Sequence, residues 1–146
     1  DQRTVSMKVV GLNNRVYDLN LSKFTVTGNE IVNRSQYHIQ ARMLLRDMFK
    51  GYVLLEEVKM PGSRCPIKKS TLFLDFFIQN LMLAVEVHGR QHYEYVPFFH
   101  KSKLGYIAAQ KRDIIKQEWC ELNHIKLVAL KYSDTPEQWR EQIERR

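Results

Sequence analysis

Residues 72–88 constrain the fold more than any other part of the chain. They form two strongly apolar runs that only Gln79-Asn80 separates, which is typical of a β-hairpin whose side chains alternate between two faces. A two-residue turn at 79–80 places Asp75 opposite Ala84. One face is then wholly apolar, so we expect it to face the core. Its side chains are Leu72, Leu74, Phe76, Ile78, Leu81, Leu83, Val85 and Val87.

The other face of this hairpin carries Asp75, Glu86 and His88. Glu86 is a diagonal neighbour of Asp75, within reach of one shared ligand. Two adjacent carboxylates repel each other unless a cation lies between them, and Mg²⁺ prefers such oxygen ligands. His88 can carry a proton or contact a phosphate. Alternatively, the two acids lie on a solvated face, each paired with an Arg or Lys. The apolar character of both strands favours the metal site.

The remaining pattern predicts a small α/β domain with a mixed sheet. Helices are expected over 36–49, over 103–122 and from Pro136 onward, and further strands over 52–58 and 125–132. The order is helix, three antiparallel strands, helix, strand, helix. The predicted buried stripe of the long helix is Leu104, Ile107, Ile115, Trp119 and Leu122.

The first residues read as two strands, 5–10 and 16–24, around an Asn-Asn turn. We therefore expect an N-terminal β-hairpin extension over 1–32, before a main domain over 33–146. It would bind DNA or cover a sheet edge. Since the chain starts at Asp1 and not Met, we expect a piece of a longer protein.

Composition favours a polyanionic partner. The 146 residues include 23 Lys and Arg against 16 Asp and Glu, a net charge of +7, and nucleic acid is the commonest polyanion. No window approaches the roughly 18–20 apolar residues of a membrane span, and we expect neither a membrane partner nor a signal peptide. The two cysteines, Cys65 and Cys120, suggest a reducing compartment, hence a cytoplasmic, intracellular protein.

The pair His88 and His92 has the spacing of half a zinc site. Cys65 and Cys120 are conceivable partners, but the sequence contains no CxxC and no second His pair, so a structural zinc site is disfavoured.

The hairpin motif resembles the PD-(D/E)XK nuclease superfamily. Asp75 is followed after ten residues by Glu86-Val87-His88, with His at the position of the family lysine. The resemblance is greatest to the very-short-patch repair endonucleases and the EDxHD phage homing endonucleases, where a His-Gly ends the next strand thirteen residues after the Asp. His88-Gly89, Arg112-Asp113 and Pro61-Gly62 fit that subgroup, and the resemblance spans about 35–132.

This resemblance implies a restriction-endonuclease-like core and Mg²⁺-dependent cleavage of double-stranded DNA, with Mn²⁺ as a substitute. Asp75 would bind the metal, with Glu86 or the Val87 carbonyl as a second ligand. His88 and His92 would handle protons, and Asp113 would orient one of them or a metal-bound water. A phage-encoded protein in a bacterial host, and a homodimer, are compatible with it.

One position departs from the family. A Glu on the first helix usually points at the site, whereas this helix offers Gln40 or His38, and Glu57 could take over the role. A Gln can orient water but cannot neutralise a metal. We expect basic side chains around the site to contact phosphates. These are Arg64, Lys68, Lys69, Arg90, Lys101, Lys103, Lys111, Arg112 and Lys116.

Two alternatives to a homing-type or repair-like nuclease stay open: a DNA-binding module that does not cleave, and a nuclease specific for branched junctions. The aromatic stretch 93–99 either packs the edge of the core or stacks against bases.

Overall fold

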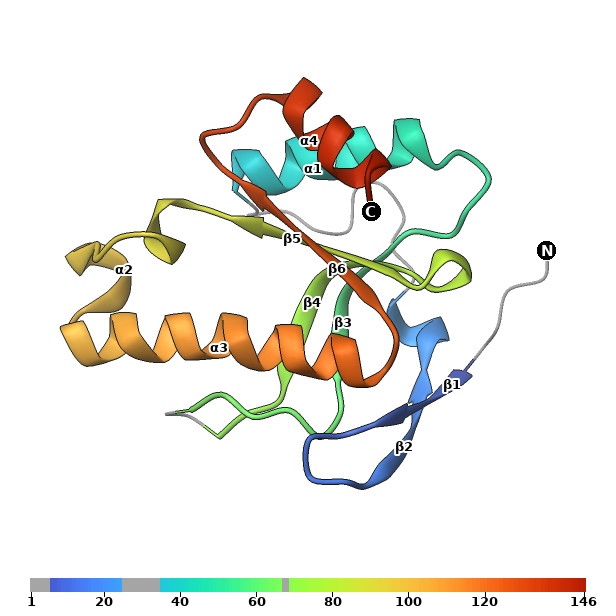
Figure 1. Ribbon diagram of the computed structural model, residues 1–146, viewed down its shortest axis with the longest axis horizontal. Coiled ribbons are helices and arrows are strands. Elements are labelled where there is room, and N and C mark those ends of the chain that lie inside the picture. Colours follow the sequence, from blue (N-terminus) through green and yellow to red (C-terminus); the bar gives the residue numbers. More distant parts are fainter. Residues whose placement is uncertain (1–5, 25–34, 67–68) are drawn as a thin grey trace.

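A four-stranded sheet in the order β3-β4-β5-β6 forms the centre of the protein (Figure 1). The computed structural model describes residues 6–24, 35–66 and 69–146. β3 (Leu55–Met60), β4 (Leu72–Ile78) and β5 (Leu83–His88) are antiparallel neighbours, and β6 (Lys126–Lys131) joins β5 in parallel. The predicted α/β class with a mixed sheet is confirmed.

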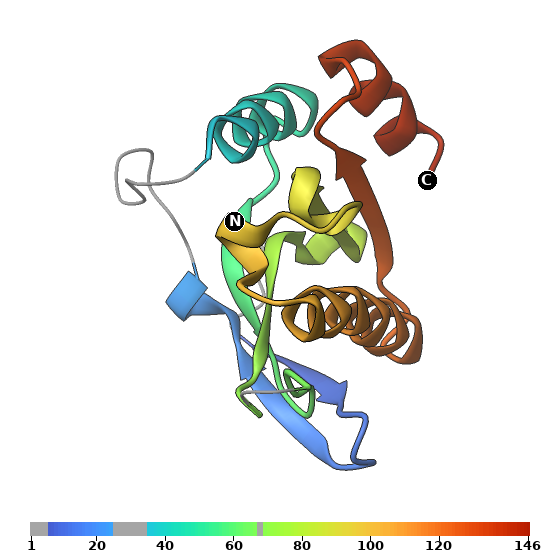
Figure 2. The same cartoon turned by 90° about the vertical axis from the view of Figure 1, so that its left-hand side faces the viewer.

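Helices cover both faces of this sheet. α1 (Gln36–Met48) and α4 (Pro136–Glu144) lie together on one face, and α3 (Lys103–Leu122) lies on the other (Figure 2). Side-chain caps fix where the helices begin: Ser35 accepts the N–H of His38, and Thr135 forms a capping box. The predicted helix ends agree with the structure to within a residue or two.

The predicted buried stripe of α3 is wrong in part. Leu104 is 73% exposed, and Ile107 and Leu122 are also exposed. Trp119 is buried as predicted, and Ile115 is half-buried against the core. The other residues that α3 buries are Ala108, Ala109 and Cys120. Small alanines on the sheet side leave the larger apolar side chains of the first turns facing outward, and apolar periodicity alone does not show this.

The predicted two-residue turn between β4 and β5 is also wrong. The connection includes a 3₁₀ turn, η2 (Gln79–Leu81), and then Met82 with a φ of +47°. Ala84 consequently pairs with Phe77, not with Asp75. Because the register moves by two residues, the alternation of side chains along each strand is kept. The single apolar face predicted for the hairpin nevertheless divides between two clusters, since Leu72 and Leu74 pack with Trp119 of α3. Phe76, Ile78, Leu83 and Val85 pack in the cluster that contains α1 and α4 residues.

The N-terminal hairpin packs on the same core. β1 (Ser6–Val10) pairs with β2 (Val16–Asn20), and η1 (Leu21–Phe24) replaces the end of the second predicted strand. Its apolar side chains join the cluster beneath α3. At Gly11 an added Cβ would lie 2.6 Å from the Cα of Gly62, so the hairpin approaches the loop after β3 backbone to backbone. The expected boundary at 32 lies outside the described residues.

Strand β3 begins three residues later than predicted, at Leu55. Within the described part of the chain, no helix combines the length and apolar character that a membrane span requires.

Candidate active site

Asp75 and Glu86 lie at the point where β4 and β5 separate. The last pair in register is Phe76 with Val85, and beyond it side chains take over the hydrogen bonds. The N–H of Asp75 donates to Glu86 Oε2 (2.6 Å), and the N–H of Val87 donates to Asp75 Oδ2 (2.8 Å). These reciprocal bonds fix both carboxylates side by side, closer than the diagonal placement that the predicted register gives.

The two carboxylates open into one cleft of about 310 Å³. Its lining residues come from five elements and their connections: Ser35, His38, Asp75, Glu86, Val87, Gln91, His92 and Lys116. Lys116, on α3, places its Nζ 2.6 Å from Glu86 Oε1. Glu86 is 2% exposed, so the alternative of a solvated face is wrong for this residue, whereas the lysine partner which that alternative expected is present.

Burial, then the neighbouring charge of Asp75, raises the pKa of Glu86 to about 8, although Lys116 opposes the shift. The pKa of Lys116 is also raised, because Glu86, Asp75 and Asp113 outweigh the effect of its burial. Lys116 alone therefore does not offset the burial of Glu86 and its repulsion by Asp75, and Glu86 holds a proton near neutral pH unless a further cation lies beside it.

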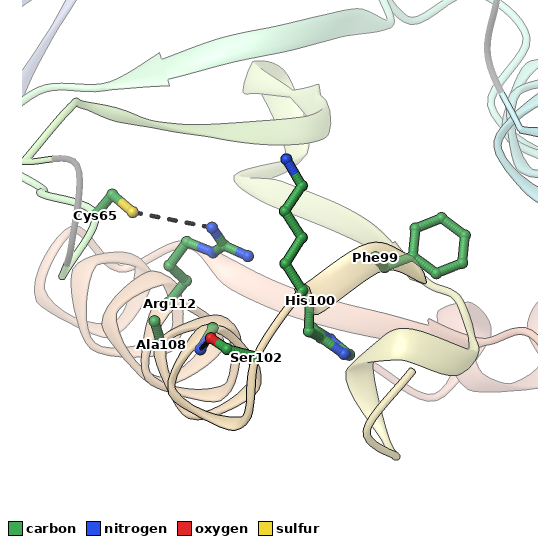
Figure 3. Close-up of a pocket in the computed structure, with 8 residues that line it drawn as sticks. Cys65, Phe99, His100, Ser102, Ala108 and Arg112 are labelled. Carbon is green, nitrogen blue, oxygen red and sulfur yellow. Dashed lines mark hydrogen bonds between the residues drawn. The ribbon is translucent and has the colours of Figure 1, made fainter. Parts of the chain in front are cut away.

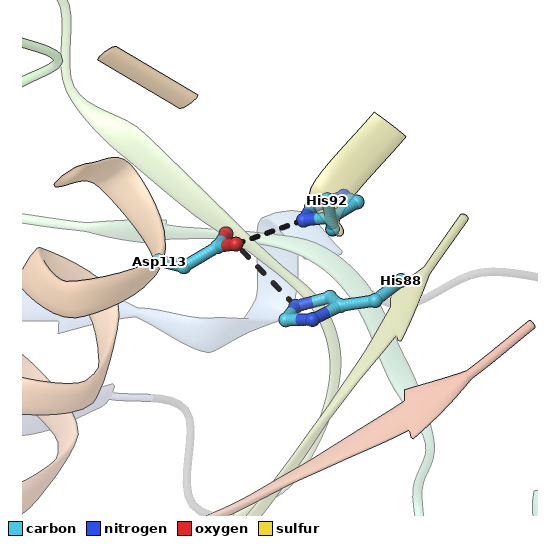
Figure 4. A group of neighbouring side chains, drawn as sticks. All are labelled: His88, His92 and Asp113. Atoms are coloured by element: carbon cyan, nitrogen blue, oxygen red, sulfur yellow. Dashed lines mark hydrogen bonds and ion pairs between the residues drawn. The ribbon is translucent and has the colours of Figure 1, made fainter. Parts of the chain in front are cut away.

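His88, His92 and Asp113 form a second group beside this cleft (Figure 4). His88 ends β5, His92 ends η3 (Arg90–His92), and Asp113 lies on α3. His92 Nδ1 is 2.9 Å from Asp113 Oδ2, and His88 Nε2 is 4.0 Å from Asp113 Oδ1. The two imidazole rings stack with centroids 4.0 Å apart. Asp113 thus lies within hydrogen-bond distance of one histidine.

The environment sets the protonation of this group. Burial, then the neighbouring His92, lowers the pKa of His88 to about 4, so its ring is neutral near pH 7. Burial would raise the pKa of Asp113, but the hydrogen bond and charge of His92 outweigh it and lower that pKa. Asp113 is therefore ionised.

Gln40 does not belong to the site, and this prediction is wrong. It lies on the exposed side of α1, whereas His38, on the other side, lines the cleft. His38 Nε2 lies 2.8 Å from Glu56 Oε1, and Arg42 donates two hydrogen bonds to Glu56 (2.7 and 3.0 Å). The sequence analysis missed this buried cluster. The available signal was the i, i+4 spacing of His38 and Arg42, which places both on one helix face.

The predicted phosphate-binding residues lie in several places. Arg64, Lys69 and Lys111 line a hollow of about 370 Å³, and Lys101 and Arg112 line a neighbouring one of about 310 Å³ (Figure 3). Cys65 lines both hollows, and Arg112 reaches toward its Sγ.

The other predicted phosphate contacts differ in their surroundings. Lys103 is exposed at the start of α3, and Arg90 forms an ion pair with Glu94. Lys116 is bound to Glu86, and Lys68 lies outside the described residues.

The cysteines do not join a metal site with the histidines. Both are buried, and burial raises the pKa of Cys120 to about 12, so its thiol stays protonated. Among the described residues, three potential ligand side chains lie close enough together to share an ion: His88, His92 and Asp113.

The aromatic stretch 93–99 does not pack into the core. Phe98 is 83% exposed, and it meets Phe99 edge to face on the short helix α2 (Pro97–His100).

Comparison with known proteins finds viral relatives. The chain is 29% identical to uncharacterized protein 033L of Invertebrate iridescent virus 3 over 109 residues, 75% of this chain and 55% of that protein. It is 37% identical to uncharacterized protein 094L of Frog virus 3 over 79 residues (53% and 51%), and 37% identical to uncharacterized protein 307L of Invertebrate iridescent virus 6 over 62 residues (42% and 32%).

The chain thus spans about half or less of the length of these relatives. No family model and no solved structure matches it.

Proposed function

We propose that this protein is a Mg²⁺-dependent DNA endonuclease of the PD-(D/E)XK type, of homing or repair-like function. The observation that carries the proposal is the Asp75–Glu86 pair, which reciprocal backbone hydrogen bonds hold at the open end of two strands and which faces a cleft. Buried acids that repel each other are costly unless a cation or proton compensates them.

The donor set suits a hard divalent cation. Asp75 uses Oδ2 for the Val87 N–H, and its Oδ1 receives no hydrogen bond from the described residues. Oxygen donors from Asp75, Glu86 and the Val87 carbonyl would hold Mg²⁺. When bound, the ion would polarise a phosphodiester and lower the pKa of an attacking water. Lys116 would then be free to balance the charge of the phosphate.

The histidines would move the proton. Asp113 lies within hydrogen-bond distance of His92 Nδ1, so Nε2 is the nitrogen of that ring which would exchange a proton with the substrate or water. His88 is neutral near pH 7 and can accept a proton but rarely supplies one. The basic hollows along α3 would hold the flanking phosphates and position the duplex without selecting its sequence.

The test is nicking of supercoiled plasmid with and without Mg²⁺. We expect Asp75→Ala to lose at least about a hundredfold in nicking rate, comparable to the loss of one strong electrostatic contact in other enzymes. It should keep its affinity for DNA. Asp18→Asn, an exposed carboxylate on β2, is the matched control and should cleave normally. Equal cleavage by wild type and Asp75→Ala would refute the proposal.

A second function has support from one contact. Lys116 already neutralises Glu86, an arrangement that a DNA-binding module without cleavage could retain for stability. Such a module would bind plasmid in a salt-dependent way but produce no nicks with Mg²⁺ or Mn²⁺.

A further inference from the structure

The buried cluster of His38, Arg42 and Glu56 has no part in the proposed function, although one of its members lines the cleft of Asp75 and Glu86. His38 lies in the first turn of α1 and is 5% exposed. Only its ring can reach the cleft, because Arg42 and Glu56 are not among the residues that line it. The orientation of that ring therefore decides what the cluster contributes.

The hydrogen bonds of the cluster determine which nitrogen of His38 carries the hydrogen. Burial opposes ionisation of Glu56, but hydrogen bonds from His38 and Arg42 outweigh it and lower the pKa of Glu56, so its carboxylate is ionised. An ionised carboxylate only accepts hydrogen bonds. His38 Nε2, which lies 2.8 Å from Glu56 Oε1, must therefore be the donor. In the neutral ring the lone pair then lies on Nδ1.

The Nδ1 atom of His38 opens into the cleft. It has no hydrogen-bond partner among the described residues. No fully buried side-chain nitrogen or oxygen in this part of the chain lacks a partner, so Nδ1 must be accessible from the space that His38 lines. The ring also stacks on Phe76, with centroids 4.5 Å apart, and this contact fixes its plane. A buried and rigidly held imidazole thus presents a proton acceptor to the cleft.

We propose that His38 is a catalytic residue, which accepts a proton from the attacking water at Nδ1, and that Glu56 is the positioning residue that sets its tautomer. The inference rests on the proposed nuclease function and deepens it. A carboxylate that orients an imidazole beside a nucleophile recurs on unrelated folds. Arg42 would act one step further back, since it holds both oxygens of Glu56 at 2.7 and 3.0 Å.

Two histidines would then serve the cleft from different faces of the sheet. His38 comes from the face that α1 covers, and His92 lies beside Asp113 of α3, which covers the other face (Figure 2). His88, in contrast, lines a hollow of about 220 Å³ with Glu86. Displacement at phosphorus places the attacking and leaving oxygens roughly in line, on opposite sides of the phosphorus. One histidine on each side suits that geometry.

The proposed step transfers two protons. The water gives one proton to His38 Nδ1, and the electron pair of its oxygen forms the new bond to phosphorus. The bond from phosphorus to the leaving oxygen breaks with its electron pair, and that oxygen takes up a proton from His92 Nε2. Exchange with solvent then restores both rings.

The main test is His38→Gln in the plasmid nicking assay. The side-chain amide of glutamine can still donate a hydrogen bond to Glu56, but it offers no proton acceptor in place of Nδ1. We expect the nicking rate to fall at least about a hundredfold, in the range of general acid–base catalysis. The thermal midpoint of unfolding, and the affinity for a labelled duplex without Mg²⁺, should stay those of wild type. A merely structural His38 would instead let this variant cleave normally.

His38→Ala provides a second measurement. It should lose nicking to a similar extent and regain part of the rate when free imidazole is added, since the added ring supplies the acceptor but not its fixed position. Imidazole should not restore nicking in Asp75→Ala. His124→Asn is the matched control, because it removes an exposed histidine at a φ of +56° that Asn tolerates, and it should cleave like wild type.

Wild-type nicking by folded His38→Gln would overturn the inference and leave the nuclease proposal intact. A loss in folded His38→Ala that imidazole leaves unchanged would do the same. Circular dichroism checks the fold of each variant, and if one of the two does not fold, the other decides. Absence of nicking by wild type with Mg²⁺ would overturn both proposals.

Discussion

Two glutamates on neighbouring parts of the same sheet are equally buried, at 2% exposure, yet they have opposite electrostatic environments. Glu56, on β3, accepts two hydrogen bonds from Arg42 and lies in contact with His38. Glu86, on β5, has one cation, Lys116, and a second carboxylate beside it. Burial opposes ionisation of Glu56, but His38 and Arg42 outweigh it and lower its pKa, whereas the pKa of Glu86 rises to about 8.

This difference distinguishes Glu56, a carboxylate that stabilises the fold, from Glu86, a carboxylate of the candidate active site. Both carboxylate oxygens of Glu56 accept hydrogen bonds from Arg42, so its burial is compensated within the protein. Glu86 shares its surroundings with Asp75, and a cation in the cleft would relieve their repulsion. Burial alone does not mark a functional acid; the balance of charge around it does.

The largest expected effect is on stability at Glu56. Arg42→Ala leaves a buried carboxylate without its main partner and should cost about 3–5 kcal/mol in the free energy of unfolding. Lys116→Ala should cost no more than about 2 kcal/mol, because Glu86 can take up a proton near neutral pH. Urea unfolding, monitored by the fluorescence of the buried Trp119 and Trp139, measures the free energy of unfolding of both variants.

Arg46→Ala is the matched control for Arg42→Ala, because Arg46 lies on the exposed side of α1. It should change the free energy of unfolding by less than about 0.5 kcal/mol. Equal losses for Arg42→Ala and Lys116→Ala would show that the two glutamates do not differ in the way described.

Acidification should weaken the contribution of Glu56. Since its folded pKa lies below the unfolded value of 4.5, ionised Glu56 stabilises the fold above that value, and this contribution is lost as pH falls through the folded pKa. The stability gap between wild type and Glu56→Gln should therefore narrow from about pH 6 to about pH 3. Glu118→Gln, an exposed position on α3, gives the baseline. A gap that widens on acidification would contradict the assigned environment.

The sequence predicts this fold well where side-chain pattern and local caps decide the structure. The alternation in 72–88 identifies both strands, and Pro136 marks a helix start that the structure confirms. The register between β4 and β5 could not be predicted, because the connection uses a left-handed residue that is not glycine, Met82. Alternation constrains the face of a strand but permits a shift by two.

The candidate site divides in the same way. Asp75, Glu86 and His88 are on adjacent strands, so their proximity follows from the hairpin, and the wrong register changed only their separation. Lys116 and His38 lie on helices that are distant in sequence from the hairpin, and the local sequence does not determine how these helices pack. The prediction of Gln40 is wrong for this reason. The choice between Gln40 and His38 depends on which face of α1 packs against the sheet.

The smallest expected effect concerns two lysines one turn and a half apart on α3. Lys111 is exposed in a hollow with Arg64 and Lys69, whereas Lys116 is bound to Glu86. If the hollow holds DNA phosphates, Lys111→Ala should weaken binding modestly and lower the slope of log affinity against log salt by about 1. Without Mg²⁺, Lys116→Ala should leave that slope unchanged, because its charge is already neutralised within the protein. Fluorescence anisotropy of a labelled duplex across a salt series measures both slopes.

Lys126→Ala, exposed at the start of β6, controls for a simple loss of net charge. Identical slopes for Lys111→Ala and Lys126→Ala would remove the hollow from the DNA interface, while a reduced slope for Lys116→Ala would mean that its pairing with Glu86 yields to a phosphate.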